Sequence, residues 1–240
     1  MQNKKLFKTI EIEISTPCNL RCTTCPNREN SRPYAELPLS VIKEIILSLE
    51  KLGYSGAFSP HFYNEPLLDK RLLEILSFAR IHLPKAKIFL FTNFTLMTVN
   101  LFRKLIPLVN RFIVTIDEPV IKKAVDSITK DLNQDENKMI DMRSILTNNS
   151  FSNRAGAINS TGCRMNKLTR CFFSRDYMTI DALGDVHLCC NDYHGEAVYG
   201  NVLEKNFLDI WFSPEYTAAR EKGFQSAHPL CERCEWGEME

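Results

Sequence analysis

Three cysteines near the start of the chain, Cys18, Cys22 and Cys25, are spaced C-x3-C-x2-C. Soft thiolates at these spacings can surround a metal centre, but three ligands leave a structural zinc ion one short. On a cubane iron–sulfur cluster, three thiolates hold three irons and leave the fourth open to bind and activate a ligand. The spacing therefore predicts a reactive iron–sulfur site, with a disulfide or a zinc ion completed by a distant cysteine as the alternatives.

The composition disfavours disulfides. The chain has nine cysteines, an odd number, and its 240 residues can bury a full core without covalent cross-links. The lysines up to Lys8 are not followed by the apolar segment of a secretory signal. We therefore expect free thiols and a location in the reducing cytoplasm.

The charge balance argues against two classes of partner. Thirty basic and 29 acidic residues give a net charge of +1, so no field that would attract nucleic acid or a membrane surface is expected. No apolar run approaches the roughly 18 residues of a membrane span. The sequence predicts a globular protein whose partners are neither nucleic acid nor membrane.

The first half of the chain alternates strand and helix patterns. Residues 9–14 have the period of two that is typical of a strand. Further strands are predicted at 57–62, 87–91 and 112–116, and helices at 39–52, 66–83, 99–108 and after Pro119. The Asn- and Asp-rich residues 130–138 are expected to be a flexible loop. Such alternation indicates a parallel sheet covered by helices, an α/β fold.

Polar side chains follow each predicted strand. The cysteines come after the first strand, the segment from His61 to Pro66 after the second, Thr92 and Asn93 after the third, and Asp117 after the fourth. Ligands of parallel sheets bind at the carboxyl ends of the strands, so these groups should share one mouth. Asp117 could bind substrate or cap the next helix, and His61 could equally be a packed core histidine.

The pattern changes after about residue 165. Residues 176–181 and 185–190 alternate around Ala182-Leu183-Gly184, which predicts a β-hairpin. A short helix is expected at 208–212, and the chain ends with a C-x2-C pair at Cys231 and Cys234. We expect two domains, 1–165 and 166–240.

Taken together, these motifs resemble the radical S-adenosylmethionine (radical SAM) superfamily. The cysteine loop is followed by Asn64-Glu65-Pro66 after the second strand, and the C-terminal cysteine pattern resembles the twitch domain, a shortened relative of SPASM. Phrases such as His61-Phe62-Tyr63, Ser152-Asn153-Arg154 and Asp209-Ile210-Trp211 look like those of an aminocyclitol-oxidising member. The resemblance implies a partial (β/α)6 barrel with a small C-terminal domain, built from a β-hairpin and a helix, that holds an auxiliary cluster.

The resemblance also implies two clusters and S-adenosylmethionine (SAM). The first 4Fe-4S cluster would use Cys18, Cys22 and Cys25, and Glu65 would receive the amino group of SAM. The residues expected beside SAM are Asn64, Thr92, Asn93 and Thr24, where Thr24 stands in place of the usual aromatic residue. An auxiliary 4Fe-4S cluster, or alternatively a zinc clip, would be held by Cys171, Cys189, Cys231 and Cys234.

The implied reaction begins with reduction of SAM by a flavodoxin- or ferredoxin-type protein, which gives a 5′-deoxyadenosyl radical. Abstraction of hydrogen beside a hydroxyl group, followed by loss of a proton and an electron to the auxiliary cluster, would oxidise a small cyclitol- or sugar-like substrate. Arg154 and Tyr63 are the expected catalytic residues, with Arg154 more suited to binding because a guanidinium is a poor base. Asn191 stands where the aminocyclitol-oxidising relative has a glutamate, so the substrate could differ.

Other interpretations stay open. The same machinery could modify a ribosomal precursor peptide, although only about eight residues precede the first strand, which favours a small molecule. A non-catalytic iron–sulfur carrier and a zinc-binding module are the alternatives outside enzymes. Cys190 should point away from Cys189 because neighbouring strand residues face opposite sides, and Cys163 is expected to be an apolar filler.

Overall fold

The structure is a computed structural model that describes residues 5–29, 31–144, 151–159 and 163–239. Its main element is an eight-stranded sheet in the order β10-β9-β8-β1-β2-β3-β4-β5. These strands are β1 (Thr9–Ile12), β2 (Ala57–Ser59), β3 (Lys87–Phe91), β4 (Arg111–Thr115), β5 (Ile140–Arg143), β8 (Tyr177–Ile180), β9 (Asp185–His187) and β10 (Val198–Asn201). The strands from β8 to β5 run parallel, and β9 and β10 are antiparallel additions.

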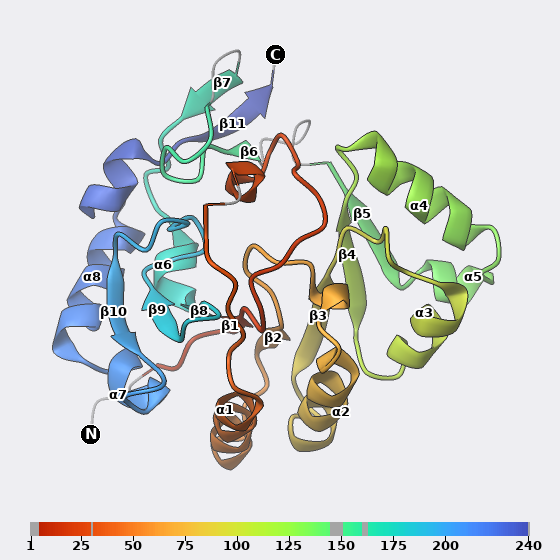
Figure 1. Cartoon of the computed structure of the whole chain (residues 1–240). Coiled ribbons are helices and arrows are strands. Elements are labelled where there is room, and N and C mark those ends of the chain that lie inside the picture. The colour runs from red at the N-terminus through yellow and green to blue at the C-terminus, as the bar shows by residue number, and fades with distance from the viewer. Residues whose placement is uncertain (1–4, 30, 145–150, 160–162, 240) are drawn as a thin grey trace.

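Helices cover the convex side of this sheet (Figure 1). In the first half they are α1 (Leu39–Lys51), α2 (Leu72–His82), α3 (Val99–Leu105), α4 (Pro119–Thr129) and α5 (Gln134–Asn137). The helices of the second half are α6 (Phe172–Asp176), α7 (Phe207–Trp211) and α8 (Pro214–Phe224). Short 3-10 turns occur in both halves: η1 (Pro26–Glu29), η2 (Pro66–Leu68) and η3 (Pro229–Arg233). The sheet curves but does not close, so the predicted α/β partial barrel is confirmed.

The sequence of β1 explains how the sheet sits in the molecule. Ile10, Ile12 and Ile14 are fully buried in the core beneath the helices. The residues between them are polar and face the opposite, concave side, because successive side chains of a strand alternate. Strands β2 to β4 also bury apolar residues on the outer side, whereas their inner side mixes polar residues such as Ser59 and Thr115 with apolar ones such as Phe91.

The predicted hairpin is present as β8 and β9, joined by a turn at Asp181 to Gly184. Gly184 has φ +90°, and a Cβ there would lie 2.7 Å from the Asn201 side chain, so glycine suits this turn. Because β8 also pairs with β1, the C-terminal segment continues the sheet of the N-terminal segment.

A second, three-stranded sheet was not predicted. It has the order β6-β11-β7, with β6 (Phe151–Ser152), β7 (Cys163–Asn166) and β11 (Trp236–Met239). In Figure 1 it lies at the top, above the loop that carries the first cysteines. Cys163 belongs to β7, but its side chain lies outside the described part of the structure, so its predicted role as a filler stays a prediction.

Two predicted segments differ from the structure. The helix predicted over 66–83 is divided into η2 and α2, because Asp69 adopts an extended conformation and binds the Arg71 guanidinium and backbone N–H. Residues 130–138, predicted as a loop, contain α5. Asn133 and Glu136 form a reciprocal capping box there, which stabilises a single helical turn.

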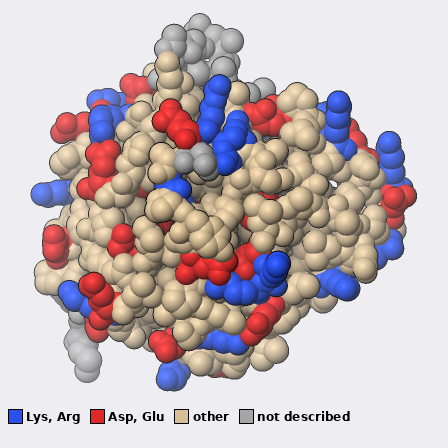
Figure 2. All heavy atoms as spheres, viewed as in Figure 1, with Lys and Arg blue, Asp and Glu red and all other residues tan. Residues whose placement is uncertain are grey.

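Acidic and basic side chains are interspersed over the face shown in Figure 2, in keeping with the near-zero net charge. Among the described residues, no helix is long and apolar enough to cross a membrane.

Candidate functional site

A cavity of about 990 Å³ occupies the concave face of the sheet. Its wall is formed by the side chains that alternate with the apolar core positions of each strand. One representative from each parallel strand is Glu11 (β1), Ser59 (β2), Phe91 (β3), Thr115 (β4), Arg143 (β5) and Tyr177 (β8). The cavity mouth carries the polar segments that follow the strands, so the sequence prediction of one shared mouth agrees with this geometry.

Cys18, Cys22 and Cys25 line this mouth as half-buried, free thiols. The loop turns tightly between them, since the Cys25 N–H donates to the Cys22 carbonyl at 3.2 Å. Burial is the largest cause that raises the pKa of Cys22, to about 12, and it also raises the pKa values of Cys18 and Cys25. A metal centre would have to displace these thiol protons, as metal sites with thiolate ligands do.

A residue that sequence reasoning missed anchors the cysteine loop. Glu118, between β4 and α4, accepts hydrogen bonds through Oε1 from the Thr23 N–H at 2.7 Å and the Thr23 hydroxyl at 3.0 Å. The sequence signal was its position directly after Asp117 at the end of β4. Asp117 itself accepts a hydrogen bond from the Ser144 hydroxyl at 2.5 Å and lines the cavity.

Glu65 is almost fully buried, and three protein donors surround its carboxylate. Oε1 accepts from the Thr92 hydroxyl at 2.7 Å and from the Leu67 N–H at 3.0 Å, and Oε2 accepts from the Asn93 N–H at 2.6 Å. A carboxylate has about four acceptor positions, so about one stays available toward the cavity. That is the capacity needed to receive a single ammonium hydrogen.

Asn93 and Asn64 complete this part of the mouth. The Asn93 Nδ2 donates to the Asn19 Oδ1 at 2.8 Å and lies 4.0 Å from the Cys18 Sγ, which ties β3 to the cysteine loop. Within the described residues, the Asn64 Nδ2 is buried and has no hydrogen-bond partner. Such an orphaned donor fits a site completed by a ligand carboxylate or hydroxyl. Thr24 is buried against the same cavity.

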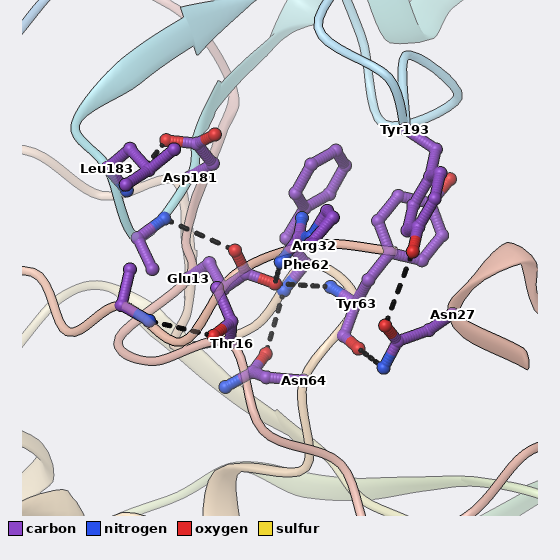
Figure 3. A network of polar contacts seen from close by, with 12 residues as sticks. Glu13, Thr16, Asn27, Arg32, Phe62, Tyr63, Asn64, Asp181, Leu183 and Tyr193 are labelled. Atoms are coloured by element: carbon purple, nitrogen blue, oxygen red, sulfur yellow. Dashed lines mark hydrogen bonds and ion pairs between the residues drawn. The ribbon is translucent and has the colours of Figure 1, made fainter. Parts of the chain in front are cut away.

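Tyr63 is held from three sides, two of which, its contacts with Glu13 and Asn27, are drawn in Figure 3. Its N–H donates to the Glu13 Oε1 at 3.0 Å, its carbonyl accepts from the Asn27 Nδ2 at 3.0 Å, and its hydroxyl donates to the Cys190 carbonyl at 2.8 Å. Burial raises the pKa of Tyr63 well above its ordinary value, so the phenol keeps its proton. Tyr63 can therefore orient a ligand, but it is not a base.

The buried carboxylate of Glu13 connects three segments. Besides Tyr63, it binds the Arg32 guanidinium at 2.5 Å and the Ala182 N–H at 3.2 Å, from the turn between β8 and β9 (Figure 3). Arg32 also lies over the ring of Tyr193, with its Cζ 5.4 Å from the ring centroid. These contacts fix the segment after the first cysteines against the C-terminal part of the chain. The only sequence signal for these contacts of Glu13 was the presence of a carboxylate within a predicted strand.

Arg154 lies in the turn after β6 and lines the cavity. Its φ of 51° and the φ of 53° at Ala155 are left-handed, a conformation that costs a non-glycine residue about 1–2 kcal/mol. Burial opposes its positive charge, but Tyr63 and the nearby cysteines raise the pKa of Arg154 overall, so it stays a cation. Its Nη1 donates to the Asn191 Oδ1 at 2.9 Å.

His61 also lines the cavity, stacked on Phe91 with ring centroids 3.9 Å apart. Its Nδ1 pairs with the Ser59 hydroxyl at 2.7 Å. Burial, and secondly the charge of Arg154, lowers the pKa of His61 to about 3, so the imidazole is neutral. It is a packed, uncharged part of the wall.

A second cavity of about 130 Å³ lies beside the first. Its lining residues all lie between Ala155 and Trp236, and they include the four cysteines predicted to hold an auxiliary cluster, Cys171, Cys189, Cys231 and Cys234. Asn191 belongs to this wall too, because its Nδ2 donates to the Cys234 Sγ at 3.3 Å and to the Ser152 hydroxyl at 2.9 Å.

Cys189 and Cys190 face different cavities. Cys189 lines the small one and Cys190 the large one, so one peptide bond separates the two sites. The loop that carries both cysteines is fixed by His187. Its Nε2 lies 3.1 Å from the Asp181 Oδ2, and its Nδ1 lies 3.4 Å from the Asp192 Oδ2. Sequence reasoning missed this bridge, which holds the loop after β9 in place.

The donor sets fit iron–sulfur clusters better than single ions. No group of three or more His, Cys, Asp or Glu side chains in the described segments is arranged to hold one metal ion. Sulfurs that bind a zinc ion at about 2.3 Å would enclose no further space. Four thiols that line one cavity of about 130 Å³ instead suit a larger sulfide-bridged group.

Comparison with protein families identifies both parts of the chain. Residues 12–140 match the model of the radical SAM superfamily, and residues 171–235 match SPASM, described as an iron–sulfur cluster-binding domain. The first match contains the cysteine loop and the segment around Glu65. The second contains the four cysteines of the small cavity.

Individual relatives give the same result. The chain is 28% identical over 236 residues to the S-adenosyl-L-methionine-dependent 2-deoxy-scyllo-inosamine dehydrogenase of Niallia circulans, covering 96% of this chain and 93% of the relative. It is similar to the crystal structure of BtrN in complex with AdoMet and 2-DOIA, with a TM-score of 0.84, 27% identity and the same coverage. Native anSMEcpe with bound AdoMet shares the fold, with a TM-score of 0.57 and 15% identity over 90% of this chain and 82% of that one.

Proposed function

Because the chain belongs to the radical SAM superfamily, we propose that it oxidises a small hydroxyl-bearing substrate by two electrons. The substrate class is a cyclitol or a similar sugar-like ring. Its similarity over 96% of its length to a 2-deoxy-scyllo-inosamine dehydrogenase, and to BtrN in complex with 2-DOIA, supports this choice. A flavodoxin- or ferredoxin-type protein would be the reductant.

The observation that carries the proposal is the position of Cys189 and Cys190. They place the wall of the substrate cavity one residue away from the wall of the small cysteine cavity. An oxidation that starts with hydrogen abstraction must still dispose of one electron, and an adjacent closed cluster can accept it. Epimerisation of a peptide is redox-neutral and has no such need, so this adjacency favours an oxidation; the similarity to a cyclitol dehydrogenase favours a ring substrate over a peptide that is oxidised or crosslinked.

The residues at the mouth would hold the first cofactors. Cys18, Cys22 and Cys25 would ligate a 4Fe-4S cluster, and Glu65 and Asn64 would receive the amino and carboxylate groups of SAM. When bound, the cluster and SAM supply a carbon radical that removes a hydrogen atom from the substrate. Thr24, Thr92 and Asn93 would line the SAM site.

The substrate would lie deeper, between the mouth and Arg154. Arg154 stays charged and would donate hydrogen bonds to substrate oxygens, while Tyr63 would orient the ring by its hydroxyl. Cys171, Cys189, Cys231 and Cys234 would hold the auxiliary cluster, all four irons of which would then be ligated by protein. We propose residues 1–165 and 166–240 as the two domains that supply these sites.

The test is an anaerobic reaction of the reconstituted protein with SAM, a reductant and a panel of cyclitols and aminocyclitols that includes 2-deoxy-scyllo-inosamine. The expected result is one product two mass units lighter than its substrate, formed together with 5′-deoxyadenosine. Cleavage of SAM without such a product from any ring compound, and with a mass change in a precursor peptide, would contradict the proposal and favour a peptide-modifying enzyme.

A further inference from the structure

Glu11 is a buried carboxyl group in the wall of the substrate cavity. It lies in the centre of β1, in register with Ser59 on β2 and Thr179 on β8. The Thr179 hydroxyl donates to its Oε2 at 3.2 Å. This is the one hydrogen bond to the Glu11 carboxyl among the described residues, so the group is largely uncommitted on its cavity side.

The contrast with Glu13, two residues further along the same face, is informative. Glu13 has a guanidinium and two backbone N–H donors, which together compensate its burial. Glu11 forms no ion pair with any described residue at bonding distance. A buried carboxyl kept without such partners costs stability, and cavities that bind substrate are where such groups occur.

The charged and titratable groups facing Glu11 come from three elements. Arg154 approaches from the turn after β6, Tyr177 from β8 and Cys190 from the loop after β9. Burial is the main cause that raises the pKa of Glu11 to about 7, while Thr179 and Arg154 act against it. Glu11 can therefore exchange a proton near neutral pH.

Three other polar groups of the cavity wall, Arg154, Tyr63 and His61, are poorly suited to take a proton. Arg154 stays a cation and donates to Asn191, and Tyr63 keeps its phenolic proton and donates it to the Cys190 carbonyl. His61 is neutral, but its low pKa makes it a very weak base. The Glu11 carboxylate is better suited to general-base catalysis than these three. The carboxylates on the opposite part of the cavity lining, Asp117, Glu118 and Asp141, already accept hydrogen bonds from Ser144, Thr23 and Arg143.

We propose that Glu11 is the proton acceptor of the oxidation, a role that rests on the proposed dehydrogenase function. The substrate carbon first loses a hydrogen atom, as its C–H bond breaks and a C–H bond forms on the 5′ carbon derived from SAM. The hydroxyl O–H bond then breaks, and its proton binds the Glu11 carboxylate. As the C=O bond forms, the remaining electron would be taken up by the oxidised auxiliary cluster that Cys171, Cys189, Cys231 and Cys234 would hold. Arg154 stabilises the negative charge that develops on the oxygen.

The test compares the reconstituted parent with Glu11→Gln, using the cyclitol that the parent oxidises, deuterated at the carbon that becomes the carbonyl. Glutamine has the same shape and can still bond Thr179, so the cavity should be preserved. We expect deuterium to enter 5′-deoxyadenosine in both proteins, and the rate of ketone formation to fall at least about 100-fold in the variant. A rate within twofold of the parent would overturn the proposal.

Two further readouts exclude a merely structural effect. Ketone formation by the parent should rise with pH around 7, and Glu11→Asp should recover part of the rate with its pH dependence, whereas Glu11→Gln should lose that dependence. Infrared titration should show a protonated carboxyl band that disappears near pH 7 in the parent and is absent from Glu11→Gln. An unchanged pH profile in Glu11→Gln, or no Glu11-dependent band, would contradict the role.

The outcomes separate this proposal from the proposed function. If the parent itself forms no ketone from any ring compound, the dehydrogenase function fails and the role of Glu11 fails with it. If the parent forms ketone and Glu11→Gln does so equally well, the function stands and only the role of Glu11 is lost.

Discussion

The Nη1 of Arg154 donates to the Oδ1 of Asn191 at 2.9 Å. Because Arg154 lines the large cavity and Asn191 the small one, this hydrogen bond joins the proposed substrate site to the auxiliary cysteines. The Nδ2 of the same Asn191 amide donates to the Cys234 Sγ at 3.3 Å. A charge that develops beside Arg154 is thus two side chains away from a sulfur ligand of the proposed acceptor.

The first prediction concerns the potential of the auxiliary cluster. Hydrogen bonds to cluster sulfurs raise the reduction potential, so Asn191→Ala should lower it. Asn191→Asp is the matched control, since it keeps an acceptor for Arg154, loses the donor to Cys234 and adds a negative charge. It should lower the potential further. Redox titration followed by electron paramagnetic resonance measures both, and potentials equal to that of the parent would contradict the assigned contact.

The second prediction concerns the anchor of the cysteine loop. Glu118→Ala removes the acceptor of both Thr23 hydrogen bonds, so the first cluster should be lost to a chelator about 10-fold faster or more. Glu118→Gln keeps an acceptor oxygen and should behave nearly as the parent. Iron release recorded over time after reconstitution measures this, and equal rates in the parent and the alanine variant would show that the anchor is dispensable.

The third prediction concerns stability. Glu13→Gln leaves the buried Arg32 guanidinium without its carboxylate and should lower the free energy of unfolding by about 3–5 kcal/mol. Glu74→Gln is the control, because its pair with Lys43 is solvent-exposed and contributes less than about 1 kcal/mol. Anaerobic thermal unfolding compares the two. A similar, small loss in both variants would refute the structural role of Glu13.

The fourth prediction is a pH dependence of stability caused by Glu11. Its pKa is raised from 4.5 to about 7 in the folded protein, so the folded state binds this proton more tightly than the unfolded state. Tighter proton binding stabilises the folded state fully below pH 4.5, and this stabilisation is lost as pH rises through 7. The free energy of unfolding falls by about 3 kcal/mol in total for this reason. As the pH rises from 5 to 8, the Tm of the parent should therefore fall relative to the Tm of Glu11→Gln. A constant Tm difference would contradict the pKa.

The cysteine loop and the segment around Glu65 could be predicted from sequence because their chemistry is local. Fixed spacing identifies Cys18, Cys22 and Cys25, and the polar residues after each strand follow from the geometry of parallel sheets. The capping box at Asn133 and Glu136 was equally local, and its signal was overlooked in favour of the polar composition of that stretch.

Other features depend on contacts between distant residues. The small sheet pairs Trp236 with Ser152, two positions that no local pattern relates. Glu11 lies on the inner face of a strand whose alternation was visible, but only the folded sheet shows that this face lines a cavity. Whether Asn191 faces the substrate or Cys234 likewise depends on the path of the loop after β9, which His187 fixes between two aspartates.

The measurement that most directly tests the two-cluster account is iron, sulfide and zinc per chain after anaerobic reconstitution. It compares the parent with a variant in which Cys18, Cys22 and Cys25 are all changed to Ala. The account predicts about eight irons in the parent and about four in the variant, because two 4Fe-4S clusters bind independently. About four irons in the parent, with one zinc retained by the variant, would contradict it and remove the proposed electron acceptor.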